Sequence, residues 1–235
     1  MGTRSLLAVE KSEGVLHSQY MQFDGYPTCK GRDFFERIAA SFGECREYFC
    51  DGNRKPNGNF VQRVVDFLND YQYQSGHSIG SHQECKLADW LKADSWQEWQ
   101  YLWRLNGDFV TFHRGEEKAL VIPFEIVAAL GRDCRLLKFG ETDTLLSKFW
   151  SGVEEYLGFN PEYAAVGEKP PVAPRLTVLT GECFAFPEQK AGGWRSYVEV
   201  KLGGRKIYSS ILSNAGQKRS QMVFKAKFVP AKAFK

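Results

Sequence analysis

Three prolines fall within the six residues Lys169–Pro174, and this segment constrains the fold more than any other in the chain. Proline has no backbone N–H and a fixed φ angle, so neither a helix interior nor a central strand continues through such a run. Closely spaced prolines favour an extended, semi-rigid spacer instead. The sequence therefore predicts two parts, one of residues 1–167 and one of residues 168–235.

The two parts carry opposite net charge, which the average over the chain conceals. All 235 residues together carry +3. Residues 168–235 contain 13 Lys and Arg against four Glu and no Asp, a net charge of +9, whereas residues 1–167 carry −6. Such asymmetry is informative about partners rather than about fold. It predicts an acidic part that serves self-association or recruitment and a basic part that binds nucleic acid.

The acidic part has the sequence pattern of mixed strands and helices. Arg4–Glu10 and Val15–Phe23 flank a turn at Gly14, which is typical of a β-hairpin. Asn106-Gly107 predicts a second hairpin, because this dipeptide readily adopts the positive φ angles of a type I′ turn. The other expected elements are helices over residues 34–42, 60–71 (capped by Asn59), 123–131 (begun by Pro123) and 145–157 (capped by Thr144), and a strand over residues 120–122.

The basic part has little helical periodicity and glycine pairs at its turns, which predicts an antiparallel sheet. The expected strands are Leu176–Phe186, Trp194–Leu202, Lys206–Leu212 and Met222–Val229. The predicted fold class is α+β: a mixed α/β amino-terminal domain, 1–167, and a small antiparallel β-rich carboxy-terminal domain, 168–235.

Cysteine usage and hydropathy indicate the compartment. No uncharged apolar run approaches the roughly 18–20 residues that span a bilayer, and no secretory signal is evident at the start. The six cysteines are then expected to be reduced and mostly buried. The sequence predicts a cytoplasmic protein without membrane contact and without a cofactor.

Two motifs in the acidic part carry a resemblance. The chain opens with Met1-Gly2-Thr3-Arg4-Ser5, continues to Asp24-Gly25-Tyr26-Pro27, and has a hairpin at Asn106-Gly107-Asp108. Over roughly residues 1–125 it resembles uncharacterised bacteriophage proteins that begin MGTRS and carry a downstream DGYP. The resemblance implies a phage origin, the cytoplasm of an infected bacterial host and a mixed α/β domain. It supplies no catalytic residue.

Two patterns that suggest chemistry have simpler explanations. Gly76-His77-Ser78-Ile79-Gly80 matches the G-x-S-x-G elbow of hydrolases, but a helix precedes it where the elbow needs a strand. His82 and Cys85 have the spacing of one half of a zinc site, yet Cys45 and Cys50 are a poor second pair. We therefore predict neither a catalytic residue nor a metal site, and expect a protein that is not an enzyme.

The basic part contains cations interleaved with aromatic residues, the two features that single-strand binders need for phosphates and bases. Strand alternation also permits a simpler arrangement, in which rings such as Phe224 and Phe228 form the core and lysines such as Lys225 face solvent. We adopt that arrangement for the last strand and retain its lysines as phosphate contacts. The candidate nucleic-acid-binding residues are Trp194, Arg195, Tyr197, Lys201, Arg205, Lys206, Lys218, Arg219, Lys225 and Lys227.

The function predicted from these features is that of a bacteriophage accessory protein that binds nucleic acid, with single-stranded DNA favoured over duplex and little sequence preference. It would act in viral transcription, replication or recombination, as a homo-oligomer and in contact with a viral or host polymerase. The alternative is a host-protein-binding inhibitor or anti-defence protein that uses Trp90, Trp96, Trp99 and Trp103 as exposed anchors. A tryptophan cluster more often forms core, and a hydrolase is the third alternative.

Overall fold

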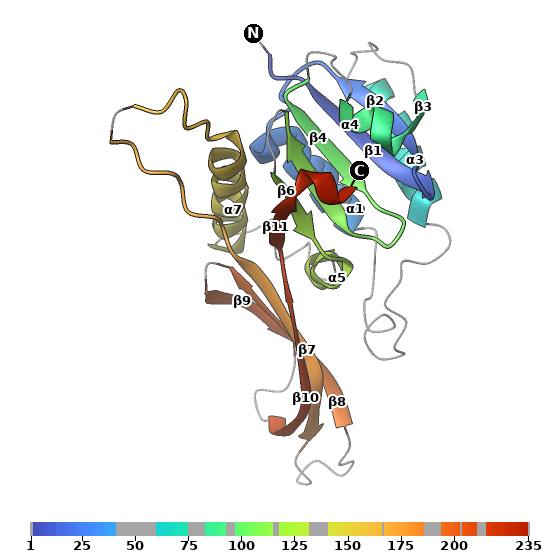
Figure 1. Cartoon of the computed structure of the whole chain (residues 1–235). Coiled ribbons are helices and arrows are strands. Elements are labelled where there is room, and N and C mark those ends of the chain that lie inside the picture. The colour runs from blue at the N-terminus through green and yellow to red at the C-terminus, as the bar shows by residue number, and fades with distance from the viewer. Residues whose placement is uncertain are drawn as a thin grey trace.

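The computed structural model describes residues 2–40, 60–74, 83–92, 97–114, 118–131, 141–165, 167–185, 194–202, 204–210 and 215–234. They form an α+β fold with a seven-stranded mixed sheet, which we call the body sheet, and a four-stranded antiparallel sheet, which we call the arm. Figure 1 shows the strands of the arm extending away from the body sheet.

The body sheet has the strand order β11-β6-β5-β4-β1-β2-β3. All neighbours are antiparallel except β1 and β4, which run parallel. The predicted amino-terminal hairpin is confirmed, with Gly14 at a φ of 71° in its turn. The strands are β1 (Ser5–Ser12), β2 (Val15–Met21), β3 (Gln83–Lys86), β4 (Trp99–Trp103), β5 (Phe109–His113), β6 (Lys118–Ile122) and β11 (Lys227–Pro230).

Four helices cover one face of the body sheet and bury its largest side chains. They are α1 (Arg32–Ala40), α3 (Phe60–Gln74), α5 (Phe124–Gly131) and α7 (Glu141–Gly158). Each presents an apolar stripe to a shared core, and aromatic rings dominate its centre: Phe35 stacks on Trp103 with ring centroids 5.9 Å apart. The helix predicted to begin after a cap at Thr144 begins earlier, at Glu141, so the capping prediction is wrong.

The opposite face of the body sheet has a smaller apolar cluster under two short segments, α4 (Leu87–Lys92) and η2 (Ala231–Phe234). Trp90 of α4 is buried there, and its indole Nε1–H donates to Ser18 Oγ at 2.9 Å. Trp99 and Trp103 are equally inaccessible on the other face. These three tryptophans are core, so the prediction of exposed anchors is wrong for them, and Trp96 lies outside the described residues.

The arm has the strand order β10-β7-β8-β9. Its strands are β7 (Leu176–Ala185), β8 (Trp194–Leu202), β9 (Arg205–Ser210) and β10 (Ala215–Lys225). Helix α5 contacts β7, β8 and β10, so the arm is attached to the body through the helical layer. The predicted α+β class with a small antiparallel sheet in the basic part is therefore present.

The last predicted strand, Met222–Val229, is wrong as a single element. It consists of the end of β10 and most of β11, with Ala226 between them, and the two halves belong to different sheets. β11 pairs antiparallel with β6 at the edge of the body sheet. The division at residue 168 stays a prediction, but the chain returns to the body after the arm.

None of the helices in the described ranges is long and apolar enough to cross a bilayer.

Candidate nucleic-acid interface

The strand register of the arm places three predicted cations in one row across the sheet. Lys225 of β10 pairs with Thr177 of β7, Thr177 pairs with Lys201 of β8, and Lys201 pairs with Lys206 of β9. Register partners in an antiparallel sheet occupy the same face, and neighbouring strands are about 4.8 Å apart. The row therefore brings three lysine positions from distant parts of the sequence within about 15 Å of one another.

Burial distinguishes the two faces of the arm next to this row. Leu176 is 1% exposed, and Phe224 packs against the main core, whereas Val223 is 50% exposed and Lys225 is exposed. The same alternation continues beyond β10, where Ala226 and Phe228 pack on the core and Lys227 is exposed. The predicted arrangement of this segment, rings inward and lysines outward, is confirmed.

The cations of this face differ in how far they are neutralised. Lys201 Nζ lies 2.9 Å from Glu199 Oε1, two residues before it on the same strand, and both side chains are partly exposed. Lys225 and Lys227 form no ion pair with any residue that the structure describes. An exposed ion pair contributes little to stability, and water screens it. Among the described lysines of this face, Lys225 and Lys227 thus carry uncompensated positive charge, whereas Lys201 does not.

Other strand pairings place some of the remaining predicted residues on the same face of the arm as these lysines. Cys183 pairs with both Lys218 and Arg195, which gives a second row of two basic positions towards the far end of the arm. Tyr197 pairs with Gly181. Positions 195, 197, 199 and 201 are every second residue of β8, so they lie on one face of the strand. Arg195 and Tyr197 therefore share the face of Lys201.

Three predicted residues are not placed on that face. Trp194 pairs with Phe184, and Arg205 pairs with Leu202, whose other partner is the buried Leu176. Both positions therefore lie on the other face of the arm, the one that meets the core. Arg219 falls within a register shift between Lys218 and Ser220, so alternation assigns it to neither face.

Sequence reasoning missed one exposed cation beside these rows, Arg175. The Ala226 N–H donates to Leu176 O at 2.9 Å, which continues the pairing of β10 with β7 by one residue. Continued register would place Arg175 opposite Lys227. Both side chains are exposed. The signal was alternation from Thr177, but Arg175 lies one residue before the predicted strand Leu176–Phe186.

The residues considered for metal or catalytic chemistry give no site in the described ranges. Among the residues that the structure covers, no three His, Cys, Asp or Glu side chains gather as metal ligands would. Cys85, on β3, is a half-buried free thiol, and burial raises its pKa. His82, Cys45, Cys50 and the segment 76–80 lie outside the described residues.

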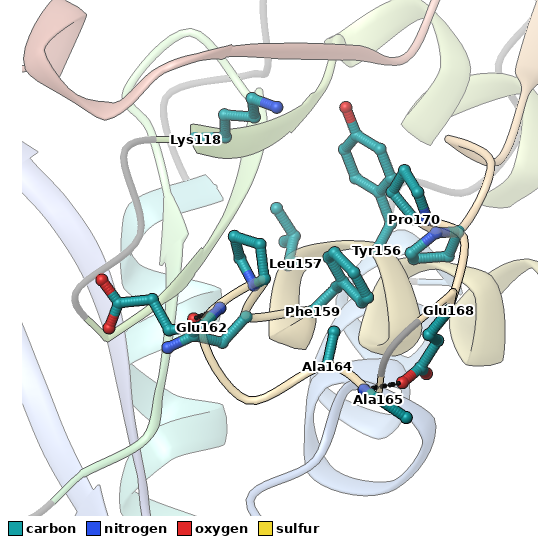
Figure 2. A pocket seen from close by; sticks show the side chains of 12 residues that line it. Lys118, Tyr156, Leu157, Phe159, Glu162, Ala164, Ala165, Glu168 and Pro170 are labelled. Atoms are coloured by element: carbon teal, nitrogen blue, oxygen red, sulfur yellow. Dashed lines mark hydrogen bonds between the residues drawn. The ribbon is translucent and has the colours of Figure 1, made fainter.

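An open hollow of about 970 Å³ lies beside the carboxyl end of α7, under the loop that leads to the spacer. Figure 2 shows Lys118 and the ring of Tyr156 at this hollow. Lys118 Nζ is 5.4 Å from the centroid of the Tyr156 ring. The centroid of the Phe228 ring is 4.5 Å from the same point. Glu168 Oε2 accepts the Ala165 N–H at 2.9 Å and so closes the loop on itself. Sequence reasoning did not single out this hollow.

The segments 2–5 and 24–27 meet in space. The Gly25 N–H donates to Thr3 O at 2.9 Å, and a Cβ on Gly25 would lie 2.7 Å from the carbonyl carbon of Arg4. The Tyr101 hydroxyl donates to Gly25 O at 2.8 Å. Asp24 has a φ of 57°, a conformation that Asp tolerates in turns. These contacts give both segments a structural role: they join the residues just before β1, the segment that follows β2, and β4.

Comparison of the chain with protein-family models, with curated proteins and with solved structures finds no match.

Proposed function

We propose that the protein is a bacteriophage accessory protein that binds nucleic acid through the exposed face of the arm. The observation that carries this proposal is the row of Lys225, Lys201 and Lys206, because pairing across all four strands holds the three positions in one line. A flat cationic face can follow a phosphate backbone, and it neutralises phosphates regardless of base sequence. Little sequence preference follows.

A single strand fits this face better than a duplex. Duplex readout usually inserts a helix with basic and amide side chains into the major groove. The basic residues of α1 are instead paired within that helix, Arg32 with Glu36 and Arg37 with Asp33. Single-strand binders combine a cationic track with a ring for stacking, and Tyr197 is in step with the lysines. Single-stranded DNA is therefore the proposed ligand, in viral transcription, replication or recombination.

Fluorescence anisotropy with labelled oligonucleotides of about 16 nucleotides tests the proposal. Single-stranded DNA, duplex DNA and RNA are compared at about 50 and 200 mM salt. We expect single-stranded DNA to bind most tightly. Each phosphate contact should add about 0.7 to the slope of log affinity against log salt. Equal affinity at both salt concentrations would refute a phosphate track.

A charge-reversed variant identifies the face. Lys225→Glu with Lys227→Glu should weaken binding to every sequence alike and lower the salt slope by about 1.4, since two contacts are lost. The matched control is Lys86→Glu, which makes the same change at an exposed lysine on β3, the edge strand at the other side of the body sheet. Normal binding by the double variant would exclude these two lysines from the site.

The partners other than nucleic acid remain part of the proposal. Contact with a viral or host polymerase and self-association are consistent with the charge difference between residues 1–167 and 168–235, because opposite charges steer encounter. If none of the three nucleic acids binds, a host-protein inhibitor becomes the better explanation. Its contacts would then be sought at exposed apolar residues such as Tyr163, which is 86% exposed.

A further inference from the structure

The chain continues without a turn from the arm into the body sheet, and its exposed lysines continue with it. β10 ends at Lys225, and β11 begins at Lys227, with Ala226 between them. In an extended chain, residues two apart lie about 6–7 Å from each other on the same side. Lys225 and Lys227 are both exposed, whereas Phe224 and Phe228 pack on the core. The cationic face of the arm is therefore continuous with one face of the body sheet at β11.

The face of the body sheet that Lys227 joins is the one that carries η2. Lys227 pairs with Val121 of β6, and Val121 packs against the smaller apolar cluster together with Ala231 and Phe234 of η2. Phe228, on the other side of β11, contacts Tyr156 at the hollow. The hollow is thus on the opposite side of β11 from the cations and does not belong to the same surface.

The short η2 segment is fixed to the body by its last aromatic ring. Phe234 makes an edge-to-face contact with Phe112 at 5.3 Å between centroids. The guanidinium carbon of Arg104 lies 5.8 Å from the centroid of the Phe234 ring. Arg104 in turn binds the buried carboxylate of Glu10 at 2.6 Å. Lys232, which is exposed, is consequently held on a fixed support rather than on a loose tail.

We propose that the path of the nucleic-acid strand does not end on the arm but crosses Arg175 and Lys227 and reaches Lys232 on η2. One strand would then be held by the arm and the body together. The row across the arm spans about 15 Å, and the extended chain from Lys225 to Pro230 adds about 17 Å. This inference rests on the proposed function, and it adds Arg175 and Lys232 to the residues that contact phosphate.

The experiment compares two lengths of single-stranded DNA, about 4 and about 16 nucleotides, which are the limits of site sizes for single-strand binding folds. The full-length variant Arg175→Gln with Lys232→Gln removes both proposed contacts without reversing charge. On the longer strand the salt slope should fall by about 1.4, because two contacts are lost. On the shorter strand, which the row of the arm can hold alone, the slope should stay that of the wild type.

The outcomes separate this inference from the proposed function. If wild-type protein binds neither length, the proposed function fails and the extended path fails with it. If the wild type binds but the double variant keeps the full slope on the longer strand, the path ends on the arm and only the inference is overturned. Lysine acetylation followed by mass spectrometry gives a second measurement. Bound 16-nucleotide DNA should protect Lys232, and an unprotected Lys232 would also overturn the inference.

Discussion

Replacement of Gly31 by alanine tests the packing that joins the DGYP segment to the body sheet. Gly31 ends the π-helical turn η1 (Pro27–Gly31) and is buried. A Cβ at this position would lie 2.4 Å from Cε1 of Tyr101 and 2.8 Å from its hydroxyl oxygen. Real Cβ atoms essentially never approach other heavy atoms so closely. Either the Tyr101 ring or the backbone of η1 has to move.

The Tyr101 ring has little freedom to move. It is completely buried and stacks on Phe109 with centroids 6.2 Å apart. Its hydroxyl donates to Gly25 O at 2.8 Å, and burial raises the pKa of this hydroxyl well above its ordinary value, so the group remains a donor. A displacement large enough to admit the methyl group would break that buried hydrogen bond.

The expected cost has two components. Forcing an extra methyl group into a packed core costs about 1–3 kcal/mol, and leaving a buried hydrogen-bonding group without its partner costs about 1–3 kcal/mol more. Gly31→Ala should therefore destabilise the fold by about 2–6 kcal/mol. At about 2–4 °C for each kcal/mol in a chain of this length, Tm should fall by roughly 10 °C.

Gly158→Ala is the matched control. Gly158 is the last residue of α7, and a Cβ there would meet only Cζ2 of Trp99 at an ordinary 3.9 Å. This variant should be neutral or stabilising by up to about 1 kcal/mol, because alanine restricts the unfolded chain. Urea titration and thermal unfolding compare both variants with the wild type. Equal stability of Gly31→Ala and Gly158→Ala would refute the close contact between Gly31 and Tyr101.

Three further perturbations test other parts of the structure. Glu10→Ala removes a 2%-exposed carboxylate that accepts from Arg104 Nε, and the variant should lose about 3 kcal/mol of stability in urea titration. Burial raises the pKa of Asp108 in the folded protein. At pH values between the pKa of the unfolded chain and that of the folded protein, only the folded protein keeps this proton. The free energy of unfolding should therefore fall as pH rises through this range. Urea titrations between about pH 3 and pH 7 should show this fall in the wild type and not in Asp108→Asn. Cleavage within Lys169–Pro174 should leave the two pieces associated on a sizing column, because β11 pairs with β6; separation into two folded pieces would contradict that pairing.

Local sequence patterns predicted the elements whose apolar periodicity is strong. The first hairpin and α3 were predicted because alternation and a helical stripe are visible within a few residues. β3 was missed because Gln83–Lys86 is a short edge strand of mostly polar residues, in which Cys85 packs against the smaller apolar cluster. The parallel pairing of β1 with β4 was also missed, since nothing in either segment identifies a partner about 90 residues away.

The candidate site was predictable in composition but not in arrangement. Charge counting located the basic region, and alternation predicted that Lys225 would be exposed and that Phe224 would be buried. Only the strand register shows that Lys201 and Lys225 are in one row, and that position 194 lies on the opposite, buried face. A list of cations and rings along the chain cannot separate these cases, because the face of each residue depends on pairing across the sheet.

Charge and strand pairing divide this chain at different places. Net charge changes sign near residue 168, whereas the backbone leaves the arm only after Lys225 and returns to the body sheet. The eight residues 227–234 consequently belong to the body by pairing and to the basic part by composition. Two lysines among them, Lys227 and Lys232, therefore bring positive charge onto a sheet whose other strands come from the acidic part. That overlap is the physical reason to expect a ligand that contacts both arm and body, rather than one confined to the arm.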